Sequence, residues 1–445
     1  MKTATRHLIE FLLVIALAVS LCFAWWHWSR PVLRLYIWND YIYPDVIADF
    51  ENEFNVRVEV KNYRSNEEML ARVKVSWNEF DVIMPSNHLV RGMRRQGLLA
   101  RLSGSVLENR SRIDPRYFDG PKQAAQAVKD AKAAKAAAAK AAKGQKASLL
   151  QAAMEPGANS EAPQESAVDL GRDEDYALPY LWNCLGIGYS KTEFPGTKTD
   201  DKPLPPQTWR DFFSNEVGSK FGQRRMLTAE KRELVGLALI ASGKSPNSID
   251  RAEIREAGRL LKPQVLADKP RLVWDDGGQQ LQNGSGVLLQ TWAPEITRLI
   301  ADVPAGVAGD RSWVAKNWQR AENWVSRLFV SAEQEAILHP EIGYKLPEDG
   351  SIITIDTLAI PASSGNQVLA QEFINFLLRK EIAKRVTRDS FYGNTLLAGV
   401  DESLKNTPSY MVPAKTNYLV DVDDAQLYYD GVWAEFTRIM NDSNR

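Results

Sequence analysis

The alternation of short apolar segments with helical patterns predicts an α/β fold built on a parallel sheet. Apolar runs at 33–38, 56–60 and 80–84 have the length and composition of buried strands. Between them, residues 44–54 and 65–77 carry apolar side chains at intervals of three and four. This order of strand, helix, strand, helix, strand is typical of parallel strands joined by crossover helices. With 445 residues, the chain is long enough to form two lobes.

Local signals mark where the first two helices begin. Pro44 suits the first turn of a helix because its fixed φ is helical and that turn needs no N–H donor. Asp45 follows it and places a carboxylate near the positive end of the helix. Ser65 precedes the second helix and Glu68 stands three residues later, which is a capping-box pattern. Both helix starts are therefore predicted independently of the apolar spacing.

The same alternation resumes after residue 176. The strands predicted there span 185–189, 225–228, 272–274, 286–292 and 351–357. Helical patterns begin at 208 and also cover 234–241, 313–338, 369–377 and 425–440. We interpret the apolar face of 313–338 as a core face, with a docking surface for another protein as the alternative.

Residues from about 121 to 171 differ in composition from the rest of the chain. Their first half is rich in alanine and lysine, which are strong helix formers, and has almost no large apolar side chains. Their second half, which includes EPGANSEAPQESA, has the composition of a disordered segment. We interpret the stretch as an insertion that acts as a solvated tether, with an interaction arm as the alternative.

The N-terminus predicts export from the cytoplasm. Lys2 and Arg6 precede an apolar run over 11–26, which is the pattern of a secretory signal. Three tryptophans within 25–28 resemble the aromatic belt of a membrane interface. Residues 1–30 are therefore expected to be either a signal peptide or an uncleaved anchor in the inner membrane, with the rest of the chain in the periplasm.

Composition and motifs argue against nucleic-acid binding and against catalysis. The formal net charge is −1, so the chain has no overall basic field. The four histidines do not have the spacing of metal ligands, and the two cysteines do not form a disulfide framework. The sequence contains neither a P-loop nor GxGxxG. We therefore expect no cofactor and no enzymatic activity.

Aromatic and acidic side chains recur together near the ends of the predicted strands. A carboxylate can neutralise an ammonium group through a charge-assisted hydrogen bond. An aromatic face can contact the methylenes of an amine and adds cation–π attraction of about 0.5–2 kcal/mol. A single pair is more often structural, but the repetition indicates a site for a small organic cation. The residues concerned are Trp38, Asp40, Glu230, Glu233, Trp292, Glu295 and Asp356.

At these residues the chain resembles the bacterial spermidine/putrescine-binding periplasmic proteins, the capture component of polyamine ABC transporters. Apart from its insertions, the resemblance covers the chain from about 33 to 445. It implies the type II periplasmic solute-binding fold, in which two α/β lobes with discontinuous domains are joined by a hinge. The stretches that carry it are YIWNDYIYPDVIADFENEFNVRV, YRSNEEMLARV, FDVIMPSNHLV, ALPYLWNCLGIGYS, SIITIDTLAIPASS and AQEFINFLLRKEIAKRV.

The resemblance also implies how the chain divides between the lobes. Lobe 1 takes 31–187 first, with the Ala/Lys-rich insertion, and lobe 2 takes 188–292. Lobe 1 resumes over 293–375, which contains an extra helical insertion at about 303–345. The last part, 376–445, is expected to complete both lobes.

In the first lobe the resemblance implies one wall of a ligand site. Trp38 matches an aromatic wall, Asn39 a small polar contact and Asp40 a carboxylate near the amine. Ser86 matches a polar residue at a strand end. His88 stands where relatives often carry tyrosine.

The opposite wall is implied by acids and a tryptophan from later in the chain. Glu230 and Glu233 match acidic positions, and Glu230 replaces a more usual aspartate. Trp292 matches a central stacking tryptophan, Glu295 stands where putrescine-type members carry aspartate, and Asp356 matches the acid on the strand before LAIP. Two aromatic side chains with looser alignment are Trp274 and Tyr392.

The function that the resemblance implies is capture of putrescine- or spermidine-class polyamines and their delivery to an ABC transporter permease. Closure of the hinge around the ligand is the expected mechanism. One alternative is a sensor that presents a bound polyamine to a membrane signalling protein. The others are a scaffold with weak or lost ligand binding, and a site for another small organic cation.

Overall fold

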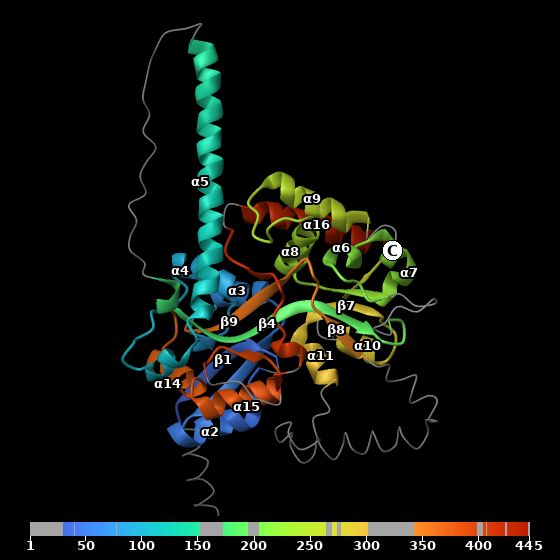
Figure 1. Cartoon of the computed structure of the whole chain (residues 1–445). Coiled ribbons are helices and arrows are strands. Elements are labelled where there is room, and N and C mark those ends of the chain that lie inside the picture. The colour runs from blue at the N-terminus through green and yellow to red at the C-terminus, as the bar shows by residue number, and fades with distance from the viewer. Residues whose placement is uncertain are drawn as a thin grey trace, which may run out of the picture.

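Two long strands that cross the molecule join its two lobes. In the computed structural model, β4 (Ala177–Ser190) pairs with β9 (Ser351–Ala359) over 177–184 and with β7 (Leu288–Trp292) over 185–189. Figure 1 shows β4 and β9 running through the middle of the molecule, between the helices of the two lobes. The structure describes residues 30–39, 41–76, 78–151, 172–194, 204–263, 269–273, 277–300, 342–397, 404–405, 407–422 and 425–443.

The first lobe is built on the predicted parallel strands. β1 (Val32–Trp38) lies between β2 (Arg57–Tyr63) and β3 (Val82–Ile83) and is parallel to both, which confirms the expected βαβ order. β9 then joins β3 in the antiparallel sense. The helices of this lobe are α2 (Pro44–Phe54), α3 (Asn66–Val75), α4 (Asn87–Arg95), α14 (Gln367–Leu377) and α15 (Lys380–Ser390).

The first two helices begin where the sequence signals place them. Pro44 is the first residue of α2. The Ser65 hydroxyl accepts a hydrogen bond from the Glu68 N–H at 3.1 Å, as a capping box requires. The Glu68 carboxylate reaches one residue further back than expected and accepts from the Arg64 N–H at 3.0 Å.

The second lobe repeats the arrangement with a second set of strands. β5 (Arg225–Thr228) lies between β6 (Arg271–Val273) and β7 and is parallel to both, while β7 and β8 (Ile342–Lys345) are antiparallel to β4. Its helices are α6 (Trp209–Phe212), α7 (Asn215–Phe221), α8 (Lys231–Ala241), α9 (Arg251–Pro263), α10 (Gly277–Gln282), α11 (Ala293–Ile300) and α16 (Gln426–Ser443).

The strand expected at 185–189 is the second half of a much longer one. β4 begins at Ala177, and almost all of its side chains are buried. A strand buried on both faces lacks the alternation of apolar and polar residues that marks a half-exposed strand. Proline is disfavoured inside a strand, so Pro179 argued against a strand at this point. In the structure it lies where the β4–β9 register shifts, which is a position that tolerates proline.

The Ala/Lys-rich stretch belongs to one continuous helix, α5 (Arg116–Gln151). Figure 1 shows α5 standing away from the body of the protein along much of its length. Nearer the body, Lys135 Nζ lies 3.2 Å from Asp250 Oδ2, which immediately precedes α9. This helix therefore contacts the second lobe, although it follows elements of the first lobe in the chain.

Several expectations fall outside the described residues. They are the N-terminal segment 1–29, the polar half of the insertion at 152–171 and the helix at 313–338. Within the described ranges, no helix has both the length and the apolar character needed to cross a membrane. The division into lobes at 187, 292 and 375 stays a prediction.

Replacing Phe50 by alanine tests the core of the first lobe. Phe50 is fully buried, with ring centroids 4.8 Å from Phe373 and 5.3 Å from Phe376. We expect Phe50→Ala to lower the free energy of unfolding by about 3–5 kcal/mol, because it removes a buried ring and leaves a cavity. Leu427 is 80% exposed, so Leu427→Ala should change the free energy of unfolding by less than about 0.5 kcal/mol. Equal effects in denaturant titrations would contradict this assignment of the core.

Candidate functional site

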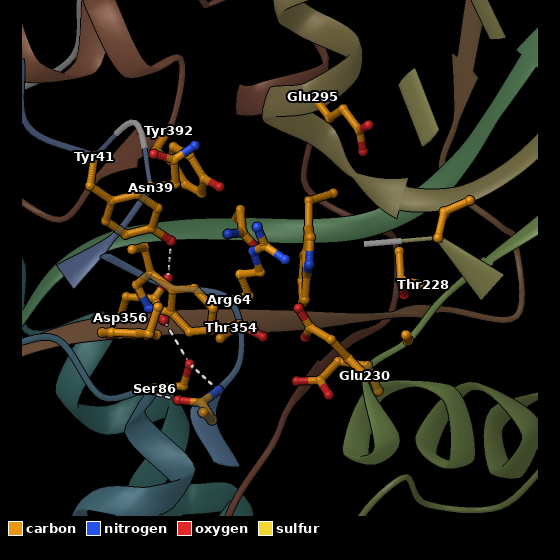
Figure 2. Close-up of a pocket in the computed structure, with 18 of the residues that line it drawn as sticks. Asn39, Tyr41, Arg64, Ser86, Thr228, Glu230, Glu295, Thr354, Asp356 and Tyr392 are labelled. Atoms are coloured by element: carbon orange, nitrogen blue, oxygen red, sulfur yellow. Dashed lines mark hydrogen bonds between the residues drawn. The ribbon is translucent and has the colours of Figure 1, made fainter. Parts of the chain in front are cut away.

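A cavity of about 470 Å³ lies between the lobes, where strands from both end. Figure 2 shows Asp356, Tyr41 and Ser86 on one side of it and Glu230, Thr228 and Glu295 on the other. The cavity lies at the carboxyl ends of β1, β5 and β7, as expected for an open α/β sheet. Eight of the ten residues singled out in the sequence line it: Trp38, Asn39, Ser86, Glu230, Glu233, Trp292, Glu295 and Asp356.

Asp356 is the central acid of the first-lobe wall. It lies on β9 with 3% of its surface exposed, and its carboxylate accepts hydrogen bonds from the hydroxyls of Tyr41 and Ser86, the latter at 2.7 Å. Burial raises the pKa of Asp356 to about 6, and the two hydrogen bonds oppose that rise. The carboxyl is therefore poised to change its charge near neutral pH.

Ser86 is held in place by a residue that the sequence reasoning missed. The Asn66 side chain donates to Ser86 Oγ at 3.0 Å and accepts from the Ser86 N–H at 3.2 Å. Asn66 is the first residue of α3 and also lines the cavity. Its position directly after the helix cap was the available signal, but a helix start alone does not predict what an asparagine side chain contacts.

Four aromatic rings form a surface beside Asp356. The Trp38 indole N–H and the Tyr63 hydroxyl both donate to the Met84 carbonyl oxygen, at 3.1 and 2.5 Å. The Trp38 and Tyr63 ring centroids are 4.5 Å apart, and those of Tyr41 and Tyr392 are 4.4 Å apart. These hydrogen bonds and ring contacts fix the rings so that they line the cavity in a defined orientation.

The second-lobe wall carries two acids at the start of α8. Glu233 is 4% exposed, and burial raises its pKa to about 7, with further upward contributions from Glu67 and Asp356. Burial also raises the pKa of Glu230 well above its usual value, and Glu233 adds to the rise, while a hydrogen bond with Trp292 opposes it. Ionised Glu233 and Asp356 therefore raise the energy of ionising Glu230, and ionised Asp356 does the same for Glu233.

None of these three acids is neutralised by a salt bridge within the described ranges. Glu230, Glu233 and Asp356 form no ion pair with a lysine or arginine there, although Arg232 lowers the pKa of Glu233 from a distance. Burying ionised groups without a counter-charge is costly, so a cationic ligand that enters this cavity would be favoured electrostatically.

Glu295 has a structural use that the sequence did not predict. One of its oxygens accepts from the Gly278 N–H at 2.5 Å, and the other accepts from the Thr291 hydroxyl. Gly278 lies at the start of α10 and Thr291 on β7. The carboxylate thus connects α10 to the end of β7 while it lines the cavity, and a role as an ammonium partner stays a prediction.

One predicted site residue, His88, is not brought into this cavity. His88 lies on α4 with 8% of its surface exposed, and it lines a separate cavity beside α5. A helix turns by about 100° per residue, so two residues beyond Ser86 the side chain faces away from Asp356. Asp40 and Trp274 lie outside the described residues, whereas Tyr392 lines the cavity.

Two arginines in the lining were missed by the sequence reasoning. Arg64 and Arg298 both line the cavity. Burial raises the pKa of Tyr392, and the charge of Arg298 opposes that rise. Both are exposed, so their charges are largely solvated. No group of three or more histidines, cysteines, aspartates or glutamates suited to a metal ion occurs in the part of the chain that the structure describes.

Comparisons with known proteins agree with this geometry. The spermidine/putrescine-binding periplasmic protein of Escherichia coli (strain K12) is 24% identical over 434 residues, covering 97% of this chain and 94% of that protein. The putrescine/cadaverine-binding protein of Pseudomonas aeruginosa is 25% identical, covering 80% and 77%. The crystal structure of the TpPotD lipoprotein of Treponema pallidum has a TM-score of 0.61 and 22% identity, covering 91% of this chain and 99% of that one.

A family model provides the broader assignment. The model described as bacterial extracellular solute-binding protein matches residues 45–411, which include both crossing strands and all the described site residues from Ser86 to Tyr392. The resemblance inferred from the sequence is confirmed at this level. The chain therefore belongs to the family of bacterial extracellular solute-binding proteins.

Proposed function

We propose that this protein binds polyamines of the putrescine and spermidine class outside the cytoplasm and delivers them to an ABC transporter permease. The observation that carries the proposal is the group of three acids around an aromatic-lined cavity between two lobes: Glu233 and Asp356, which are buried, and Glu230, which is half-buried. The names of the relatives point to the same ligands. Because the three acids form no salt bridge within the described ranges, their carboxylates are available to bind the ammonium groups.

The separation of the acids between the lobes suggests how binding drives closure. One ammonium group would interact with Asp356 in the first lobe and the other with Glu230 and Glu233 in the second. The methylenes between them would lie against Trp38 and Trp292. A diamine that bridges both walls binds the closed state more tightly than the open state, and this difference in affinity shifts the population toward closure.

Export and membrane attachment belong to the same proposal. The signal-like pattern of residues 1–30 supports an extracytoplasmic location, and the tryptophans at its end support retention as an anchor. Intact-mass measurement of the protein from a membrane fraction would decide between a cleaved and an uncleaved N-terminus.

Calorimetric titration of the full-length protein with putrescine and with spermidine tests the function. We expect saturable binding of at least one of them and much weaker binding of 1,4-butanediol, which has a similar chain but no charge. Butylamine has one ammonium group and can interact with only one wall. Its affinity should therefore lie between that of the polyamine and that of 1,4-butanediol. Absence of heat and of a thermal shift at millimolar polyamine would refute the proposal.

Replacing Asp356 by asparagine should weaken diamine binding by more than about tenfold, or about 1.4 kcal/mol. The change keeps the size of the side chain but removes the charge that receives the ammonium group. Asp130→Asn makes the same change on the exposed surface of α5 and should leave the affinity unaltered. Unchanged affinity in Asp356→Asn, measured by the same titration, would remove this residue from the site.

The affinity for putrescine should rise with pH. The amines of putrescine stay charged up to about pH 9, because alkyl ammonium groups have pKa values near 10. Asp356 and Glu233 have pKa values raised to about 6 and about 7, so both are largely protonated at about pH 5 and must release protons when a cation binds. We expect at least about tenfold tighter binding at about pH 8 than at about pH 5.

Titrations in two buffers of different ionisation enthalpy would count the protons released. Glu233→Gln should flatten the pH dependence, because it removes the group whose pKa lies nearest neutrality. Affinity that does not change with pH in the unmodified protein would contradict the assignment of these acids to the ammonium groups.

A further inference from the structure

Two adjacent cavities lie in a groove between α4 and the inserted helix α5. One has a volume of about 100 Å³ and the other about 350 Å³. Both are lined by Arg91 of α4 and by Asp421, so they are neighbours, and we refer to the two together as the groove. This groove is separate from the cavity between the lobes, with which it shares no lining residue.

The smaller cavity is mainly apolar. Tyr117, Phe118, Pro121 and Ala125 of α5 form one wall, and Val90 of α4 lies opposite. His88 also lines this cavity, and its Nδ1 has no hydrogen-bond partner within the described part of the chain. Because burial lowers the pKa of His88 to about 3, the imidazole is neutral. The charged residues in the lining of this cavity are Arg91, Lys122, Asp173, Glu174 and Asp421.

The larger cavity is strongly basic. Five cationic side chains line it, and Asp421 is its one acidic lining residue among the described residues. Arg91 and Arg94 also lie near a single acid, Asp173, at 3.6 and 2.8 Å. Over both cavities the lining contains six cationic side chains and three acidic ones, so positive charge is in excess on a chain whose formal net charge is −1. The five cations are Arg91, Arg94 and Arg95 on α4, and Lys129 and Lys132 on α5.

Contacts along α5 hold the groove in shape. Lys122 Nζ lies 2.6 Å from Glu174, and Lys135 Nζ lies 3.2 Å from Asp250. Near its start, α5 passes so close to Tyr418 that a Cβ at Gly120 would lie 2.4 Å from that ring. The described part of the inserted helix is thus attached to the body on both sides of Ala125, with Lys129 and Lys132 between the contacts.

We propose that this groove binds a small amphiphilic anion, with an apolar or single-ring body in the smaller cavity and a carboxylate or phosphate among the five cations. Arginine and lysine bind such anions through charge-assisted hydrogen bonds. A cavity of about 150 Å³ in another protein holds a benzene molecule, so the smaller cavity, at about 100 Å³, suits an apolar body no larger than a single ring. Ala125 and Lys129 are one helical turn apart, about 6 Å along the axis, which sets the distance between body and charge.

The proposal is tested with 4-phenylbutyrate, whose ring and carboxylate match this separation. Titration of the full-length protein should give saturable binding at least about tenfold tighter than that of inorganic phosphate or of 4-phenyl-1-butanol. Phosphate has the charge without the ring, and the alcohol has the ring without the charge. Equal affinity for either of these compounds, or no binding of 4-phenylbutyrate at millimolar concentration, would overturn the proposal.

Variants at each end of the groove localise the binding. The double change Lys129→Glu and Lys132→Glu reverses two of the five charges, and the change Ala125→Leu fills the apolar cavity. Each should weaken the binding of 4-phenylbutyrate by at least about tenfold. Lys384→Glu alters charge at an exposed position of α15 and should have no effect. Wild-type affinity in the double variant would refute the site.

Putrescine binding, measured on the same variants, reports whether they fold and should be unchanged. Because the groove and the polyamine cavity have no lining residue in common, failure of the unmodified protein to bind putrescine would count against the proposed function alone.

Vesicles that contain phosphatidylglycerol distinguish a lipid from a soluble source of the anion. Co-sedimentation with these vesicles that is lost in the double variant would identify a lipid headgroup and its chain as the occupant. Binding of 4-phenylbutyrate without co-sedimentation would identify a soluble metabolite. Either result supports the proposal that the groove binds an amphiphilic anion.

Discussion

The burial of carboxyl groups without a counter-charge is the constraint on which this molecule depends. The carboxylates of Asp356, Glu230 and Glu233 would be more stable in water, and burial raises the pKa of all three. Asp356 adds to the rise at both glutamates, and Glu233 adds to the rise at Glu230. The fold keeps them apart by placing one on a strand of the first lobe and two at the start of a helix in the second. Because this burial is costly, positive charge brought to both walls of the cavity would be favoured electrostatically.

Much of the fold could be predicted because most elements have one apolar face. The strands at 225–228 and 351–357 and the starts of α2 and α3 followed from local patterns. β4 was predicted at only part of its length, because a strand buried on both faces has no alternation to detect. The site was harder to predict, since it joins residues far apart in the sequence.

What the sequence missed in the site has a physical cause. Asp356 and Ser86 were both expected in the site, but Tyr41, whose hydroxyl also donates to Asp356, lies 315 residues away in the sequence, and no local pattern marks that contact. His88 was assigned to the cavity from a matching motif, whereas the turn of α4 directs it elsewhere. A motif gives the positions of residues along the chain, and the phase of a helix decides which face each one occupies.

The length of α5 has a mechanical consequence for a two-lobed molecule. A helix of 36 residues is about 54 Å long, so a rotation of about 10° at its base would move its tip by about 9 Å. The Lys135–Asp250 contact ties the helix to the second lobe, while its base lies against elements that join the two lobes. A small change of the angle between the lobes would therefore be amplified at the tip, where the helix extends away from the body (Figure 1). The tip of α5 is thus the part of the described molecule whose position would depend most strongly on the angle at the base of the helix.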